Sequence, residues 1–136
     1  MYLLDTNIIS ESTKPNPSLS VLRKLHLHKD KLCICIFVWH ELLFGLHCLP
    51  QSKRRERLTH YLYKTIHPLP LYSYDLEAAE WYAIERARLK VTGKTPAIID
   101  GQIAAIAKVN NLVLVTRNTA DFKYFSDTQI ENWFIE

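Results

Sequence analysis

Three acidic residues stand among side chains that are mostly apolar. Asp5 follows the apolar run Tyr2-Leu3-Leu4, Glu41 lies among Phe37, Val38, Leu42 and Gly45, and Asp100 lies among Pro96, Ile103, Ala104 and Ala107. An ionised carboxylate that faces a core costs several kcal/mol unless it is paired or coordinated. No cationic partner is obvious near any of the three in the sequence, which suggests a shared divalent cation. Oxygen ligands without a partnering histidine favour Mg²⁺ or Mn²⁺ over zinc.

Each of these acids also has a simpler interpretation. Asp5 could cap the turn that follows it, Glu41 could face water at the rim of its helix, and Asp100 could stabilise the amino end of a helix dipole. The site disappears only if all three simpler interpretations hold together. We therefore predict Asp5, Glu41 and Asp100 as metal ligands, either directly or through water.

A fourth group of polar side chains follows the apolar run at residues 112–115. Thr116 and Asn118 offer neutral oxygens to a metal, its waters or a phosphate, and Asp121 is the nearest carboxylate. We expect Thr6 and Thr116 to orient a carboxylate or a water. Arg117 is a candidate phosphate contact, although an ordinary surface arginine is the alternative.

The hydrophobic pattern predicts an α/β fold. Buried strands are expected at residues 2–4, 32–36 and 112–115, with weaker strands at 68–72 and 129–135. Helices are expected at residues 7–12, 18–28, 37–49, 53–66, 75–91 and 95–109, with Ser52, Asp75 and Thr95 as N-caps. Apolar strands that alternate with helices indicate a mostly parallel sheet covered on both faces. Ligands of such sheets bind at the carboxyl ends of the strands, where Asp5 would lie.

The bulk properties fit one domain spanning residues 1–136. Hydrophobic residues make up 48% and charged residues 23% of the chain, and the net charge is +3. This mild positive charge is compatible with a polyanionic partner. No apolar run is long enough to cross a membrane, and no basic leader precedes an apolar segment, so we expect a cytoplasmic protein. Cys33, Cys35 and Cys48 fit no disulfide or zinc pattern and are expected to be buried, reduced thiols.

The densest basic cluster is the segment Lys53-Arg54-Arg55-Glu56-Arg57. We identify Lys53, Arg54 and Arg55 as candidate contacts to RNA phosphates, with binding that weakens as the salt concentration rises. A solvated helix face is the simpler interpretation of the same residues.

Four segments together resemble the PIN-domain superfamily, and more closely the VapC-type toxins of bacterial toxin–antitoxin modules. They are the stretches 2–10, 41–45, 100–105 and 115–118, in the order of the family's motifs. The resemblance implies a three-layer α/β/α sandwich and a metal-dependent endoribonuclease, in which a metal-activated water attacks without the RNA 2′-hydroxyl. The family's acidic quartet maps onto Asp5, Glu41 and Asp100, and its fourth position falls on Asn118. Relatives carry aspartate there, and Asp121 is the alternative.

The resemblance also implies partners. It implies an RNA substrate, a cognate VapB-type antitoxin, a homodimer, and operator DNA bound through the antitoxin complex. An acidic stretch of the antitoxin is then an alternative partner for the basic cluster. Two other functions stay open at this point: a catalytically inactive PIN module that only binds nucleic acid or a partner, and a haloacid-dehalogenase-like phosphatase with Asp5 as nucleophile. That phosphatase family requires a second aspartate at the position of Asn7.

Overall fold

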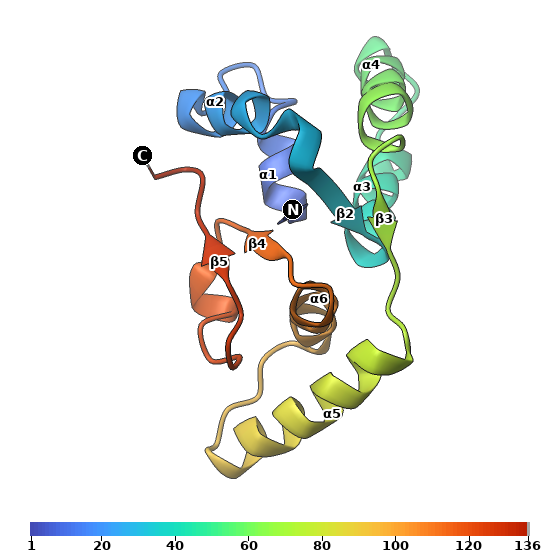
Figure 1. Ribbon diagram of the computed structural model, residues 1–136. Coiled ribbons are helices and arrows are strands. Elements are labelled where there is room, and N and C mark those ends of the chain that lie inside the picture. The colour runs from blue at the N-terminus through green and yellow to red at the C-terminus, as the bar shows by residue number, and fades with distance from the viewer. Residues whose placement is uncertain (136) are drawn as a thin grey trace.

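The computed structural model describes residues 1–135, which form a five-stranded sheet with helices around it (Figure 1). The strands are β1 (Tyr2–Leu4), β2 (Leu32–Cys35), β3 (Leu71–Tyr72), β4 (Val113–Val115) and β5 (Ile130–Glu131). Their order is β3-β2-β1-β4-β5, and every neighbouring pair is parallel. In Figure 1, α1 and α2 lie above the row of strands, and α5 and α6 lie below it. The predicted α/β class is confirmed.

The order of the strands creates a switch point in the centre of the sheet. The chain starts at β1, proceeds outward through β2 to β3, and then returns to the other side of β1 for β4 and β5. Leu4 pairs with Val115, and the amide of Asp5 donates to the carbonyl of Val115 at 2.9 Å. Asp5 and Thr116 therefore leave the sheet side by side, at the edge where open α/β sheets bind ligands.

The helices lie close to their predicted positions. They are α1 (Thr6–Glu11), α2 (Leu19–Leu27), α3 (Ile36–Cys48), α4 (Lys53–Tyr61), α5 (Leu76–Val91) and α6 (Ile98–Val109). Shorter turns are η1 (Lys29–Lys31), η2 (Leu62–Ile66, a π-helical continuation of α4) and η3 (Thr119–Asp121). Ser52 and Asp75 cap α4 and α5 as predicted, accepting from the amides of Arg55 and Ala78.

The predicted start of α6 was wrong. Ala97 is the N-cap residue, and no side chain caps this helix. Ala97 has extended backbone angles (φ −57°, ψ 139°), so the helix cannot begin at Pro96. Thr95 and Pro96 instead lie along the wall of a hollow next to Asp100.

The core fills the space between the sheet and its helices. Fully buried side chains include Leu3, Leu4, Ile34, Leu114 and Val115 from the strands. Cys33 and Cys35 are buried as expected, and burial raises their thiol pKa values to about 12 and about 11. The prediction was wrong for Cys48, which is exposed near the end of α3. Within residues 1–135, no helix has both the length and the apolar character that a membrane span requires.

Candidate active site

Asp5 is held by hydrogen bonds to both of its carboxylate oxygens. Its Oδ1 accepts from the amide of Thr6 at 2.8 Å, so it caps α1. Its Oδ2 accepts from the hydroxyl of Thr116 at 2.7 Å and from the side-chain amide of Asn7 at 3.3 Å. The capping role and a ligand role are compatible, because a carboxylate has about four acceptor positions.

Thr116 connects the ends of three neighbouring strands. Its side chain is fully buried, and its amide donates to the carbonyl of Glu131 at 3.0 Å. Its hydroxyl oxygen donates to Asp5 and accepts from the amide of Asn118 at 3.1 Å. Thr116 is therefore in contact with the Asp5 carboxylate, and the orienting role expected of it stays a prediction.

Asn7, for which no catalytic or binding role was predicted, connects β1 to the segment after β4. Its Nδ2 donates to Asp5, and its Oδ1 accepts from the amide of Arg117 at 3.1 Å. The available signal was an amide side chain two residues after a carboxylate at a strand end. Such a side chain can reach back to the carboxylate and across to the next strand end.

Asp100 lies in the first turn of α6 and is partly buried. Burial raises the pKa of its carboxyl group, and the negative charges of Asp121 and Asp5 raise it further. Within residues 1–135, the Asp100 side chain has no hydrogen-bond or ion-pair partner. Three carboxylates therefore interact repulsively at the carboxyl edge of the sheet.

The fourth position of the acidic quartet has two candidates, Asn118 and Asp121, and they interact with different residues. The amide of Asn118 donates to Thr116, whereas the exposed carboxylate of Asp121 acts electrostatically on Asp100. Asp121 and Asp100 also line the same hollow, of about 530 Å³. Asn118 and Asp121 belong to one turn, because the amide of Asp121 donates to the carbonyl of Asn118 at 3.0 Å across η3.

Glu41 lies on the exposed surface of α3, on the Thr6 side of the site. Glu41 and Thr6 line a second hollow, of about 250 Å³, together with Arg54 from α4. Glu41 thus faces water, as its simpler interpretation held, and it does so beside the residue that follows Asp5.

The carboxylates suit a divalent cation in their chemistry, although they are not assembled as a closed site. Within the described residues, no three Asp, Glu, His or Cys side chains are close enough together to hold a metal ion. The donors are nevertheless all oxygens, and the repulsion at Asp100 is not balanced by any ion pair in this part of the chain. A bound Mg²⁺ or Mn²⁺ would supply the missing positive charge, and both ions prefer oxygen ligands.

The predicted phosphate contacts differ in their availability. Arg55 is used within the fold, since it donates to the carbonyl of Leu49 at 2.9 Å. Lys53 is exposed, and Arg54 lines the hollow that contains Glu41. The guanidinium of Arg117 lies 4.5 Å from the ring centroid of Phe134. Arg54 is therefore the predicted phosphate contact that shares a hollow with Glu41.

Comparisons with known proteins agree with this fold. The PIN domain profile matches residues 2–127. The chain is 35% identical to Toxin FitB of Neisseria gonorrhoeae, with 97% of each chain covered, and 33% identical to VapC ribonuclease Y4jK of Sinorhizobium fredii, with 98% of each covered. The solved structure of FitAB bound to an IR36 DNA fragment superposes with a TM-score of 0.90 at 31% identity, covering 98% of this chain and 96% of the other.

The chain therefore belongs to the PIN-domain family, and within it to the VapC-type toxin ribonucleases of toxin–antitoxin systems. The predicted resemblance is confirmed over nearly the whole chain. Membership of this family removes the phosphatase alternative.

Proposed function

We propose that this toxin ribonuclease is a Mg²⁺- or Mn²⁺-dependent endoribonuclease whose acidic group is Asp5, Glu41, Asp100 and Asp121. The observation that carries the proposal is the placement of Asp100 near Asp5 and Asp121 at the switch point of the sheet, where Asp100 and Asp121 line one hollow and burial and the two other charges raise the pKa of Asp100. A partly buried carboxylate such as Asp100, with two further negative charges near it, is costly unless a cation offsets the charge. Asp121 takes the fourth acidic position in this proposal, and Asn118 supports the turn that carries it.

The residues of the chain divide the work of phosphodiester hydrolysis. Asp5 and Asp100 would hold the cation, with Asp121 and Glu41 acting directly or through water. A cation there would neutralise the scissile phosphate and activate the attacking water. Thr116 and Asn7 both donate to Oδ2 of Asp5, and these hydrogen bonds would hold the carboxylate in one orientation toward a cation.

The positive charge needed to hold RNA would come from α4, at the edge of the acidic site. Arg54 of this helix lines the hollow that contains Glu41, and Lys53 is exposed at the first position of the same helix. Their positive charges would attract the RNA phosphates on either side of the cleaved bond. The carboxylates of the site by themselves would repel these phosphates. RNA binding should therefore weaken steeply as the salt concentration rises.

A cognate VapB-type antitoxin is the proposed inhibitor, and the toxin is proposed to be a homodimer. The solved relative FitAB with its bound DNA fragment supports the further proposal that the toxin–antitoxin complex contacts operator DNA. In this scheme the antitoxin makes the DNA contacts and covers the acidic site of the toxin.

The test is RNA cleavage by the purified protein with Mg²⁺, with Mn²⁺ and with EDTA. Asp5→Ala and Asp100→Ala should abolish metal-dependent cleavage while the protein stays folded. Asp30→Ala is the matched control, because Asp30 is an exposed acid in η1, before the amino end of β2. Wild-type cleavage by either site variant would show that the site is misassigned. RNA binding without any metal-dependent cleavage would instead indicate an inactive binding module.

A further inference from the structure

We propose that the hollow next to Asp100 is a nucleotide subsite for the RNA substrate, in which Tyr124 stacks on a base and Lys94 contacts a phosphate. The hollow measures about 530 Å³ and is lined by Lys94, Asp100, Asp121 and Tyr124, among others. Its size lies within the range of about 300–1,000 Å³ that is usual for small-ligand sites. This inference rests on the proposed function, since it places the nucleotide beside the proposed catalytic carboxylates.

The ring of Tyr124 is accessible and lies close to positive charge. The residue is 41% exposed. The ammonium group of Lys94 lies 4.1 Å from the ring centroid, and that of Lys123 lies 5.0 Å from it. An aromatic face beside lysines is the combination with which proteins bind single-stranded nucleic acid, because the base stacks on the ring and the phosphate meets the cation.

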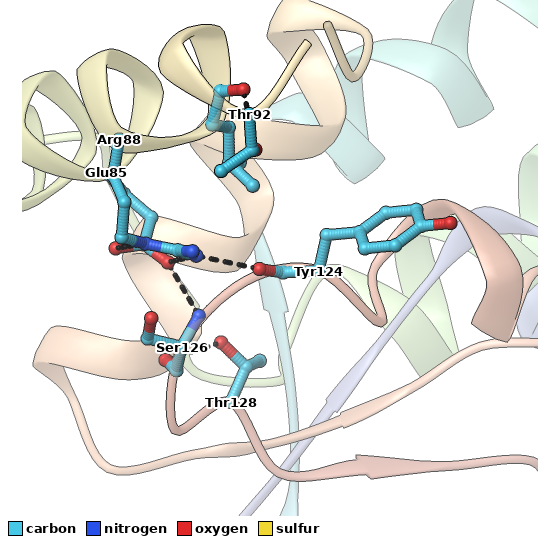
Figure 2. A network of polar contacts seen from close by, with 7 residues as sticks. Glu85, Arg88, Thr92, Tyr124, Ser126 and Thr128 are labelled. Carbon is cyan, nitrogen blue, oxygen red and sulfur yellow. Dashed lines mark hydrogen bonds and ion pairs between the residues drawn. The ribbon is translucent and has the colours of Figure 1, made fainter. Parts of the chain in front are cut away.

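The backbone of Tyr124 is fixed by hydrogen bonds, whereas its ring makes cation–π contacts with the ammonium groups of the flexible Lys94 and Lys123 side chains. Nη2 of Arg88 donates to the carbonyl oxygen of Tyr124 at 2.7 Å, and it also binds the Glu85 carboxylate at 2.6 Å. Glu85 is only 5% exposed and accepts a further hydrogen bond from the amide of Ser126. Figure 2 shows the ring of Tyr124 turned away from this network. A ring on an anchored backbone loses little conformational entropy when it binds a base.

The position of Lys94 follows from the way α5 ends. Gly93 has a left-handed conformation (φ +77°), and the amide of Lys94 donates to the carbonyl of Leu89 at 2.9 Å. This turn closes the helix and directs the chain toward α6 along the wall of the hollow. Lys94 then offers a cation in the same hollow as Asp100 and Asp121, where it offsets their repulsion of a phosphate.

The experiment measures binding of a short fluorescent single-stranded RNA to the full-length protein carrying Asp5→Ala, so that cleavage is not needed for the readout. On this background, Tyr124→Ala should weaken binding by roughly 5- to 150-fold, the loss expected for one stacked base. Tyr124→Phe should bind as the parent does, because stacking needs the ring and not the hydroxyl. Tyr63→Ala is the matched control, since Tyr63 is a similarly exposed tyrosine in η2.

A second arm replaces one RNA nucleotide at a time by an abasic residue. In the Asp5→Ala protein with Tyr124 intact, one abasic position should lower the RNA affinity about as much as Tyr124→Ala does. In the protein that also carries Tyr124→Ala, the same abasic position should cause no further loss of affinity. Lys94→Gln should reduce the salt dependence of binding by about 0.7 in the slope of log K against log salt. Thermal unfolding midpoints should change little for Tyr124→Ala and Lys94→Gln, because Tyr124 is exposed and Lys94 is only half-buried.

Two results would overturn the subsite. One is parent-like RNA binding by Tyr124→Ala, and the other is an equal effect of Tyr63→Ala. If Tyr124→Ala keeps parent-like RNA binding but binds an acidic antitoxin peptide more weakly, the hollow is a peptide site instead. Failure of the proposed function is detected separately, as absence of metal-dependent cleavage by the protein with Asp5 intact.

Discussion

The hydroxyl of Thr116 donates a 2.7 Å hydrogen bond to Oδ2 of Asp5, and so joins residues that are far apart in sequence at the ends of adjacent strands. The hydroxyl is buried and at the same time accepts from the amide of Asn118. One side chain thus fixes both the carboxylate at the centre of the site and the start of the turn that carries Asp121. Hydrogen bonds of this kind keep a ligand in one orientation.

Thr116→Val should therefore reduce catalysis without removing any proposed ligand. Valine has the shape of threonine but leaves Oδ2 of Asp5 without its shortest contact. Substitution of a residue that hydrogen-bonds to a metal ligand usually lowers metal affinity or activity by roughly 10- to 100-fold. The measurements are RNA cleavage rate against Mg²⁺ concentration, with Thr116→Ser as the variant that keeps the hydroxyl. Equal rates for the valine and serine variants would show that the hydrogen bond has no role in activity.

Asp100→Asn should separate stability from activity. In metal-free protein, the charge of Asp100 is disfavoured by burial and by Asp121 and Asp5, so its removal should raise the unfolding temperature measured in EDTA. Added Mg²⁺ should stabilise the wild type by mass action and leave the variant almost unchanged, while cleavage by the variant is lost. The control is Asp30→Asn, which should behave as the wild type does, both in EDTA and with added Mg²⁺. A variant that Mg²⁺ stabilises as strongly as the wild type would remove Asp100 from the ligand set.

The sequence was sufficient to predict the elements that carry the site, for a physical reason. Apolar runs that end in a polar residue define both a buried strand and its exit, so Asp5 and Thr116 could be placed at one edge of the sheet. The start of α6 could not be predicted, because Thr95 and Pro96 are a favourable local start that the extended conformation of Ala97 overrides.

Contacts between distant segments were also beyond the sequence. The choice between Asn118 and Asp121 depends on how the η3 turn faces α6. Likewise, the surroundings of Tyr124 depend on Arg88, which lies 36 residues earlier in the chain. Local propensity contains no information about either relationship, since both arise from packing across the sheet edge.

The Glu85 network makes a prediction about stability at low pH. Burial tends to raise the pKa of Glu85, but hydrogen bonds from Arg88 and Ser126 outweigh this effect and hold the pKa below its ordinary value of 4.5. A carboxyl group with a depressed pKa in the folded state stabilises the fold above its unfolded pKa, and this contribution is lost as the pH falls through the folded pKa. The wild type should therefore lose stability below about pH 4.5, as this group takes up a proton.

Glu85→Gln should lower the free energy of unfolding at pH 7 by about 1.5–3 kcal/mol, the usual value of hydrogen bonds to a charged group. Its difference from the wild type should shrink as the pH falls toward 3, as followed by urea unfolding. Glu80→Gln, an exposed acid on the same helix, is the control and should have little effect at any pH. A constant difference between Glu85→Gln and the wild type across this range would contradict the assigned role of the charge.

Gly101→Ala should destabilise the packing of α6 against α5. A Cβ atom at position 101 would overlap the ring of Tyr82, which is 5% exposed, so either this buried ring or one of the two helices must shift. Overpacking of this kind usually costs about 1–3 kcal/mol, measurable by urea unfolding. The double variant Gly101→Ala with Tyr82→Leu should recover part of the loss, because the smaller side chain makes room. If the double variant is no more stable than the sum of its single changes, the steric explanation fails.

The cysteines allow a test of the sheet itself. Burial raises the thiol pKa values of Cys33 and Cys35 to about 12 and about 11, whereas Cys48 is exposed on α3. Because thiolates are the reactive form, iodoacetamide at pH 8 should modify Cys48 rapidly and leave the other two thiols intact until the protein unfolds. Mass spectrometry of the native Cys48→Ser variant should find no fast-reacting thiol, and fast labelling of Cys33 would contradict its place in the central sheet.

The same two thiols affect stability at high pH. Neutral buried thiols stabilise the fold below their unfolded pKa, near 9, and this stability is lost as the pH rises toward 11.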